Sequence, residues 1–267
     1  MLDPAVAEYY GLGAEETRLF ADGRPRLEYV RTLELLERFL PAPPARVLDV
    51  GGGTGVYSTV LGERGHVVDL IDPVLAHVER ASQIAAERGL SASLTARVGD
   101  ARDLDAADGS YDAVLMLGPL YHLVDRDDRA KAWTEAVRVA RPGGVVIAVG
   151  ISRFASLLDG LKRRMLGDPV FRSVVGEDLR SGQHRNPDPA GRPMLFTTAY
   201  FHLPDELEAE ARAAGLTRVS LLAVEGPGWI VEDVDDMASL SDVARAVETE
   251  RALVAASAHM IAVGRAP

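Results

Sequence analysis

The sequence predicts an α/β protein built on a doubly wound, mostly parallel sheet. Short apolar runs alternate with amphipathic stretches through the first 150 residues, as successive βαβ units require. A glycine-rich turn over 51–55 follows the first apolar run, and acids stand at the ends of the next two. Because the carboxyl ends of parallel strands line the ligand crevice of such a sheet, these observations also predict a binding site there.

Composition limits the classes of protein that fit. The chain has 267 residues, 47% hydrophobic and 26% charged, which suits one globular domain with an elaboration. A net charge of −11 disfavours nucleic acid as a partner, since that binding depends on Lys and Arg. The absence of cysteine excludes disulfides and thiolate chemistry. With no long apolar run and no signal peptide, we expect a cytoplasmic protein without a membrane partner.

The first 45 residues are predicted to form a helical cap that precedes the first strand. Leu27, Val30, Leu33 and Leu36 recur at helical spacing. Prolines at 41, 43 and 44 then break the helix.

The first strand, Arg46–Val50, meets a turn in which Gly51, Gly53 and Gly55 alternate with other residues. Glycine permits positive φ and close approach of a ligand, and the following helix offers unpaired N–H groups. The dinucleotide fingerprint needs a third glycine at position 56, which is valine, and a P-loop would continue with Lys and Ser or Thr. Both phosphate-binding patterns therefore fail, although the turn is typical of a nucleotide-type site.

A helix over 56–64 leads to a second strand over 66–72, which ends on Asp72. This acid lies 17 residues beyond Gly55, a separation at which a carboxylate can accept hydrogen bonds from ribose hydroxyls. The pair Asp72-Pro73 is also a good helix start, and both interpretations stay open.

Two further strands each end on polar residues. A helix over 74–88 precedes a strand over 92–98, and Gly99-Asp100-Ala101-Arg102 follows it. The run 111–118 is nearly continuously apolar, as a central parallel strand should be, and is followed by Gly-Pro-Leu-Tyr-His-Leu over 118–123. His122 can take a proton near neutral pH, or it can simply pack.

The rest of the chain completes the sheet after an insertion. We predict a helix over 127–141, a turn at Arg141-Pro-Gly-Gly144 and a fifth strand over 145–149. Residues 151–203 interrupt the repeat with two helices, 153–166 and 170–179, and a polar loop, 181–192; such a long insertion is more often functional than idle. The last elements are expected at 204–214 (helix), 217–224 (strand), 235–256 (helix) and 259–263 (strand).

The spacing Asp49-x-Gly51-x-Gly53-x-Gly55 resembles the first motif of class I S-adenosylmethionine (SAM)-dependent methyltransferases. Gly99–Arg102 and the turn at 141–144 are similar to later motifs of that family, so the resemblance covers 46–150 and, more loosely, 204–263. It implies a Rossmann-like sheet of seven strands whose last strand is antiparallel and inserts between the fifth and sixth. The expected order is an N-terminal helical cap (1–45), the SAM-binding core (46–150), a lid insertion (151–203) and the C-terminal part of the core sheet (204–267).

The resemblance implies SAM as cofactor and S-adenosylhomocysteine (SAH) as product. It assigns the cofactor to the strand ends and their neighbours: Asp49, Gly51, Gly52, Gly53, Gly55, Tyr57, Asp72, Pro73, Gly99, Asp100, Ala101, Leu117 and Gly118. The candidate catalytic residues are His122, Tyr121 and Tyr10. The candidate substrate-binding residues come from the cap and the insertion: Tyr9, Arg18, Arg153, His184, Asn186, Tyr200 and His202.

The segment after the fourth strand bears on the acceptor. Enzymes of this family that methylate base or glutamine amines usually carry an Asn/Asp-Pro-Pro-aromatic tetrad there, and this chain does not. The resemblance is instead to the small-metabolite branch, of the kind that acts in ubiquinone and menaquinone biosynthesis, with transfer to O, N or C and no metal. A catalytically silent SAM-binding protein is the main alternative. An NAD(P)-linked oxidoreductase is disfavoured by the glycine spacing and the lack of a Tyr-x-x-x-Lys pair. The protein is expected to be a monomer or homodimer.

Overall fold

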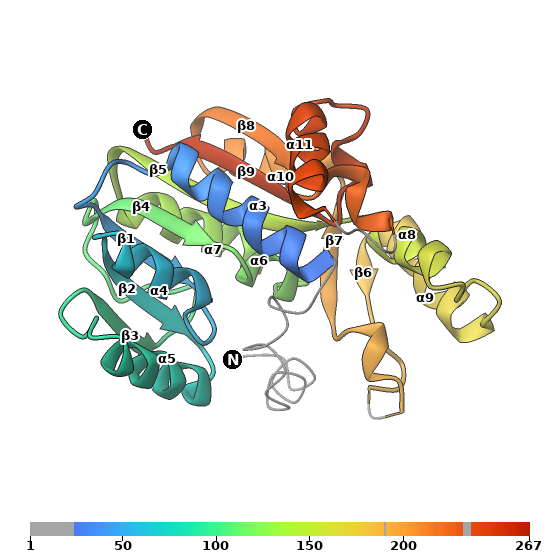
Figure 1. Ribbon diagram of the computed structural model, residues 1–267, viewed down its shortest axis with the longest axis horizontal. Helices are drawn as coiled ribbons and strands as arrows, with labels where there is room; N and C mark the ends of the chain where they lie inside the picture. The colour runs from blue at the N-terminus through green and yellow to red at the C-terminus, as the bar shows by residue number, and fades with distance from the viewer. Residues whose placement is uncertain (1–23, 190, 232–235) are drawn as a thin grey trace.

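The main sheet explains the alternation of apolar runs in the sequence. The computed structural model describes residues 24–189, 191–231 and 236–267 (Figure 1). Neighbouring strands follow the order β3 (Leu94–Val98), β2 (Val67–Asp72), β1 (Arg46–Val50), β4 (Tyr111–Met116), β5 (Ala140–Ser152), β9 (His259–Arg265) and β8 (Thr217–Ala223). The first five are parallel, and β9 is antiparallel to both β5 and β8. The predicted doubly wound sheet, with its last strand inserted antiparallel, is confirmed.

Helices cover both faces of this sheet and bury its apolar residues in two layers. On one face, α3 (Arg24–Phe39), α4 (Val56–Glu63) and α5 (Leu75–Glu87) pack against Val47, Leu115 and other residues of the strands. On the other face lie α7 (Arg126–Val139) and α10 (Pro204–Ala213), whose Trp133 and Leu207 pack against Leu48 and its neighbours. Val47 and Leu48 face opposite layers because successive strand side chains alternate.

The insertion is more ordered than the sequence indicates. Its two helices form as predicted, as α8 (Ala155–Lys162) and α9 (Pro169–Ser181). The polar stretch then forms a short antiparallel pair, β6 (Gln183–His184) with β7 (Ala199–His202), instead of a plain loop. β5 runs to Ser152, beyond the end of β4, so its last two residues pair with β7. The described sheet therefore has nine strands where seven were expected.

The remaining elements are short or begin at other residues than predicted. α6 (Pro119–His122) follows β4, and α11 (Met237–Val247) ends well before the predicted residue 256. Three short 3₁₀ helices are also present among the described residues: η1 (Pro193–Leu195), η2 (Gly226–Ile230) and η3 (Val254–Ala256). β5 begins five residues earlier than predicted because Ala140 already pairs with Tyr111 of β4. The register then shifts before Val145 pairs with Ala113, and the intervening Gly143 has φ of +74°.

Candidate functional site

A cavity of about 430 Å³ opens at the carboxyl edge of the parallel strands. Its wall is formed by the turns after β1, β2, β3 and β4, by α3, and by residues at the same edge of β5, β8 and β9. Pockets of this size at the switch point of a doubly wound sheet are typical small-molecule sites. Apart from Gly55, every residue expected to bind the cofactor lines this cavity.

The glycine turn has the backbone conformation that its sequence predicts. Gly51, Gly53 and Gly55 have φ of +70°, +58° and +84°, a region that residues with a Cβ rarely adopt. A Cβ on Gly53 would meet no atom within 4 Å, so the cavity side of the turn is open. A Cβ on Gly52 would lie 2.7 Å from Oδ2 of Asp49, which requires glycine there. Gly55 serves instead as the N-cap of α4.

Asp49 places a buried carboxylate directly beneath this turn. Oδ2 accepts a hydrogen bond from Oγ of Ser58 at 2.6 Å, whereas Oδ1 is buried and has no hydrogen-bond partner among the described residues. Burial raises the pKa of Asp49 to about 6, against the lowering effect of Ser58 and with a further contribution from the charge of Asp72. A buried acceptor that is costly to ionise suits a cationic ligand group, which would stabilise its charged form.

Asp72 ties the end of β2 to the glycine turn. Its Oδ2 accepts from the backbone N–H of Gly53 at 2.9 Å, and its Oδ1 from that of Val74 at 2.9 Å. Nδ1 of His77 lies 3.1 Å from Oδ1. These contacts show the turn-forming role that the Asp-Pro pair indicated. A carboxylate offers about four acceptor positions, so capacity for a ligand hydroxyl is still available.

Asp100 is already ion-paired in the turn after β3. Its two carboxylate oxygens accept from Nε and Nη2 of Arg102 at 2.9 and 2.6 Å, and Nη1 of Arg102 reaches Oδ2 of Asp128 at 2.6 Å. The Arg102 guanidinium lowers the pKa of Asp100. Arg102 and Asp128 also line the cavity, although the sequence did not single them out. Arg102 belongs to the turn that the sequence predicted at this strand end. Asp128 lies on α7, and no sequence motif around it indicated a binding site.

The turn after β4 crosses the glycine turn closely. A Cβ on Gly118 would lie 3.3 Å from the carbonyl oxygen of Gly51. Tyr121 and His122, which belong to α6, line the cavity with their ring centroids 4.7 Å apart, and Phe196 approaches His122 at 5.9 Å. Two of the three candidate catalytic residues are therefore at the cavity, and Tyr10 lies outside the described residues.

None of the predicted substrate-binding residues that the structure describes lines the cavity. Tyr9 and Arg18 lie outside the described residues. Five others, Arg153, His184, Asn186, Tyr200 and His202, do not line it, contrary to expectation. Four of these five make hydrogen bonds or ion pairs within the chain: Arg153 pairs with Glu206 at 2.6 Å, and Nδ1 of His184 lies 3.0 Å from Asp178. Asn186 donates to two backbone carbonyls, Tyr200 bonds Glu206, and His202 is buried 3.4 Å from Glu210.

Residues distant in the sequence complete the cavity. Glu28 and Thr32 of α3, Val224 after β8 and His259 of β9 line it, and the sequence did not predict any of them. Glu28, His259 and the buried Glu225 bring ligand-type atoms within 4.8 Å of one another. The sequence indicated no such cluster because its members are separated by 34 to 231 positions and only the topology unites them.

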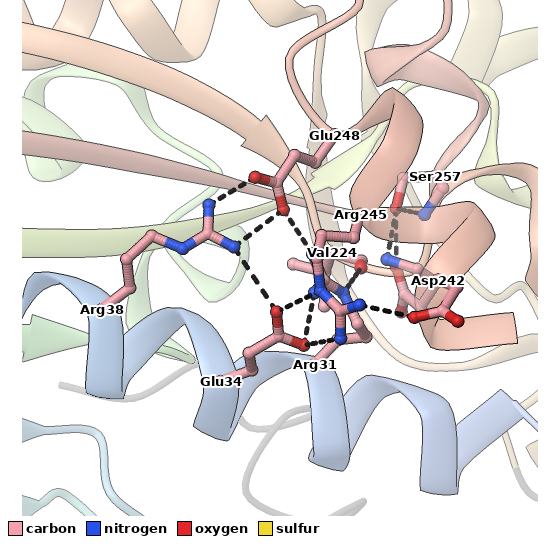
Figure 2. Close-up of polar contacts among 10 residues, drawn as sticks. Arg31, Glu34, Arg38, Val224, Asp242, Arg245, Glu248 and Ser257 are labelled. Atoms are coloured by element: carbon pink, nitrogen blue, oxygen red, sulfur yellow. Dashed lines mark hydrogen bonds and ion pairs between the residues drawn. The ribbon is translucent and has the colours of Figure 1, made fainter. Parts of the chain in front are cut away.

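A buried ion network fixes α3 in this wall (Figure 2). The guanidinium of Arg31 is fully buried; its Nε donates to the carbonyl of Val224 at 3.2 Å and its Nη2 to Glu248 at 2.5 Å. Arg38, two turns further along the helix, donates to the same carboxylate. Hydrogen bonds from Arg245 and Arg31 lower the pKa of Glu34 to about 2. The network therefore joins the helix that carries Glu28 to the segment that carries Glu225.

Comparisons with known proteins agree with this geometry. Residues 47–144 match a family model described as a methyltransferase domain. An uncharacterized methyltransferase of Mycobacterium tuberculosis is 38% identical over 169 residues, covering 63% of this chain and 60% of that protein. A ubiquinone biosynthesis O-methyltransferase of Agrobacterium fabrum is 33% identical over 135 residues, which are 48% of this chain and 52% of that protein. The chain thus spans little more than half the length of these curated relatives.

A solved structure shows the same fold. A SAM-dependent methyltransferase from Methanosarcina mazei superposes with a TM-score of 0.57 at 19% identity, over 86% of this chain and 96% of that one. In the described part of the chain, no helix is long and apolar enough to cross a membrane. Residues 47–144, which hold the glycine turn and the acids at successive strand ends, are therefore similar to a methyltransferase domain, and the chain shares the fold of a SAM-dependent methyltransferase.

Proposed function

We propose that the protein transfers the methyl group of SAM to a small metabolite. The observation that carries this proposal is the convergence of Asp49, Asp72 and Asp100, from three successive strand ends, on one cavity. The cavity also suits the cofactor chemically. The unpartnered Oδ1 of Asp49 is an acceptor for an ammonium group, and the open side of Gly53 leaves room for a ligand against the backbone.

Each strand end has a proposed share of the cofactor. Asp49 and the glycine turn would hold the methionyl end, Asp72 the ribose hydroxyls, and the turn at Gly99–Arg102 the adenine. Because Arg102 already neutralises Asp100, adenine recognition there would rest on the backbone of the turn as much as on the carboxylate. Leu117, Gly118 and Tyr121 would enclose the reacting end.

When bound, SAM supplies a methyl group activated by its sulfonium. The residues of this chain would contribute by holding the acceptor in line with that methyl group and by excluding water, which together can supply most of the acceleration. A general base is required only where the acceptor must lose a proton. His122, at the end of α6, is the base that the sequence indicated, and it lines the cavity.

A small acceptor is supported by two observations. The Gly118–Leu123 segment lacks the tetrad used on base and glutamine amines, and the net charge of −11 disfavours a polyanionic acceptor. The name of the Agrobacterium relative points to an oxygen acceptor in that protein, and we extend to this chain only the class of small-molecule acceptor.

Mass spectrometry tests this function. Incubating the protein with SAM and a fractionated metabolite extract should produce SAH together with a compound heavier by one methyl group. The matched control is Asp72→Asn, which should form both products more slowly than the wild type at a SAM concentration near the wild-type Kd. If the protein binds SAH but methylates no compound in any fraction, the result would instead support a catalytically silent SAM-binding protein.

A further inference from the structure

A histidine and a buried carboxylate form a hydrogen-bonded pair in the cavity wall. Nδ1 of His259 lies 2.6 Å from Oε1 of Glu225, and His259 lines the cavity. Oε2 of Glu225 accepts from Oγ of Ser257 at 2.7 Å and from the backbone N–H of His259 at 3.0 Å. The carboxylate is fully buried, so this arrangement fixes its position and, through it, the imidazole ring.

The topology explains why this pair lies at the cavity. β8 runs parallel to the core strands, so Glu225 follows its carboxyl end. β9 is antiparallel, so its first residue, His259, lies at the same edge of the sheet. From the facing helix α3, Oε2 of the buried Glu28 lies 3.9 Å from Nδ1 of His259. Because the inserted strand is antiparallel, its first residue, a histidine, lies at the same edge of the sheet as the acids that follow the parallel strands.

The hydrogen bond determines which ring nitrogen is basic. An ionised carboxylate only accepts, so Nδ1 of His259 must donate to Glu225, and Nε2 is then the basic nitrogen of the neutral ring. A proton taken up at Nε2 would create an imidazolium beside Glu225 and near Glu28, whose negative charges stabilise it. A carboxylate that orients a histidine in this way is a recurrent arrangement for proton transfer.

A metal site fits the same three residues less well. Their ligand-type atoms lie within 4.8 Å of one another, which is compatible with a bound ion. However, the oxygens of Glu225 already accept three hydrogen bonds, one of them from Nδ1 itself. An Nδ1 that donates its proton to Glu225 has no lone pair left for a metal, so ligation through this atom would require that hydrogen bond to break. The geometry favours proton transfer.

We propose that His259, positioned by Glu225, is the general base for a phenolic acceptor; this inference rests on the proposed methyl transfer. Nε2 takes the hydroxyl proton while the phenol oxygen attacks the methyl carbon. The bond between that carbon and the sulfonium sulfur breaks, its electron pair stays on sulfur, and neutral SAH leaves with the methyl ether. A phenol ionises near pH 10, as tyrosine does, so it needs a base at neutral pH. A neutral amine, by contrast, can attack the methyl carbon through its lone pair before it loses a proton, so it does not need a base for that step.

Two phenols of different acidity test the proposal. With 4-methylphenol, which is neutral at pH 7.5, His259→Asn should lower the methylation rate by about a hundredfold or more. With 4-nitrophenol, which is largely ionised at that pH, the rate should fall by less than about fivefold because little proton transfer is left to catalyse. Glu225→Gln should show the same graded pattern with a smaller loss, roughly tenfold on 4-methylphenol. A residue with only a structural role would not produce this dependence on acidity.

Matched variants and binding measurements keep the outcomes distinct. His66→Asn changes a buried histidine at the opposite edge of the sheet and should leave both rates unchanged. SAH affinity, measured by calorimetry, should stay within about twofold for all these variants. Equal losses on both phenols, or a graded loss with His122→Asn in place of His259→Asn, would overturn the proposal. So would activity that is lost on chelation and restored by Mg²⁺.

Failure of the proposed function gives a different result. A wild-type protein that binds SAH but methylates neither phenol would overturn the phenol base while leaving methyl transfer to another acceptor intact. A folded wild-type protein that does not bind SAH would overturn the methyltransferase function itself.

Discussion

The carboxylate of Asp72 accepts a hydrogen bond from the backbone N–H of Gly53 at 2.9 Å. This bond joins the end of β2 to the middle of the turn after β1, so two of the proposed cofactor contacts are parts of one rigid unit. The bond also holds Gly53 in its positive-φ conformation, in which the position of a Cβ atom is open. The ribose site and the methionyl site should therefore respond together when either residue is changed.

Asp72→Asn should weaken SAM binding by about tenfold to a hundredfold, because a charged acceptor is replaced by a neutral one in a partly buried site. The control is Asp69→Asn, on the same strand, whose carboxylate bonds Thr95 and Tyr111 instead. Calorimetric titration with SAM compares the two variants. Equal affinities for Asp72→Asn and the wild type would remove Asp72 from the ribose role.

SAM affinity should increase as the pH rises through about 6. Burial raises the pKa of Asp49 to about 6, so below that pH its carboxyl is neutral and attracts a ligand ammonium less strongly. Titrations of the wild type and Asp49→Asn between pH 5 and 7.5 test this. Asp49→Asn should bind weakly with little dependence on pH in this range, and the same pH dependence in both proteins would contradict the assignment.

The same carboxyl should affect the stability of the free protein in the opposite sense. A raised carboxyl pKa stabilises the fold fully below the unfolded value of 3.8, and this contribution is lost as the pH rises through the folded value of about 6. Ionised Asp49 then costs on the order of 1–3 kcal/mol of unfolding free energy at pH 7.5. Denaturation of the ligand-free proteins should show Asp49→Asn more stable than the wild type at pH 7.5, but not at pH 4. A less stable variant at pH 7.5 would argue against a buried, unpaired charge.

Gly53→Ala separates backbone strain from ligand contact. Gly53 and Gly89 both have positive φ, and a Cβ on either would meet no atom within 4 Å. Alanine at either position should cost about 1–2 kcal/mol of unfolding free energy. Only Gly53→Ala should also weaken SAM binding, since Gly89 ends α5 away from the cavity. Denaturant unfolding with parallel calorimetry checks both effects, and an equal loss of affinity in the two variants would point to a general effect of folding.

Arg31→Met should destabilise the protein by about 3–5 kcal/mol, because it removes the fully buried guanidinium that pairs with Glu248 and leaves that buried carboxylate only the more exposed Arg38 as a partner. The matched control, Arg245→Met, removes a guanidinium from the exposed side of the same network and should change stability little (Figure 2). Chemical denaturation measures the difference. If the two substitutions had equal effects, α3 would not depend on the buried part of the network.

The core of the fold could be predicted from the sequence because its signals are local. The apolar runs of β1, β2 and β4 and the positive-φ glycines at 51, 53 and 55 each encode their structure within a few residues. The acids at positions 49, 72 and 100 then follow from strand polarity alone. For these residues, the position at the cavity was predictable, while their contacts to a ligand are still predictions.

The side of the cavity formed by α3 and β9 could not be predicted in the same way. His259 reaches it only because β9 inserts between β5 and β8, and Glu28 only because Arg31 docks α3 on Val224. Conversely, polar residues of the insertion such as His184 resembled ligand-binding groups in the sequence, but they bond Asp178 and the backbone of the insertion itself. Long-range pairing decides both outcomes, and no local pattern encodes it.

Calorimetric titration of the wild-type chain with SAH and, separately, with NADPH tests the SAM site most directly. SAH should bind at one site with a Kd of roughly micromolar order, a binding free energy of about −8 kcal/mol, and NADPH should give no binding heat under the same conditions. Binding of NADPH by folded protein that does not respond to millimolar SAH would contradict the assignment of this cavity to SAM.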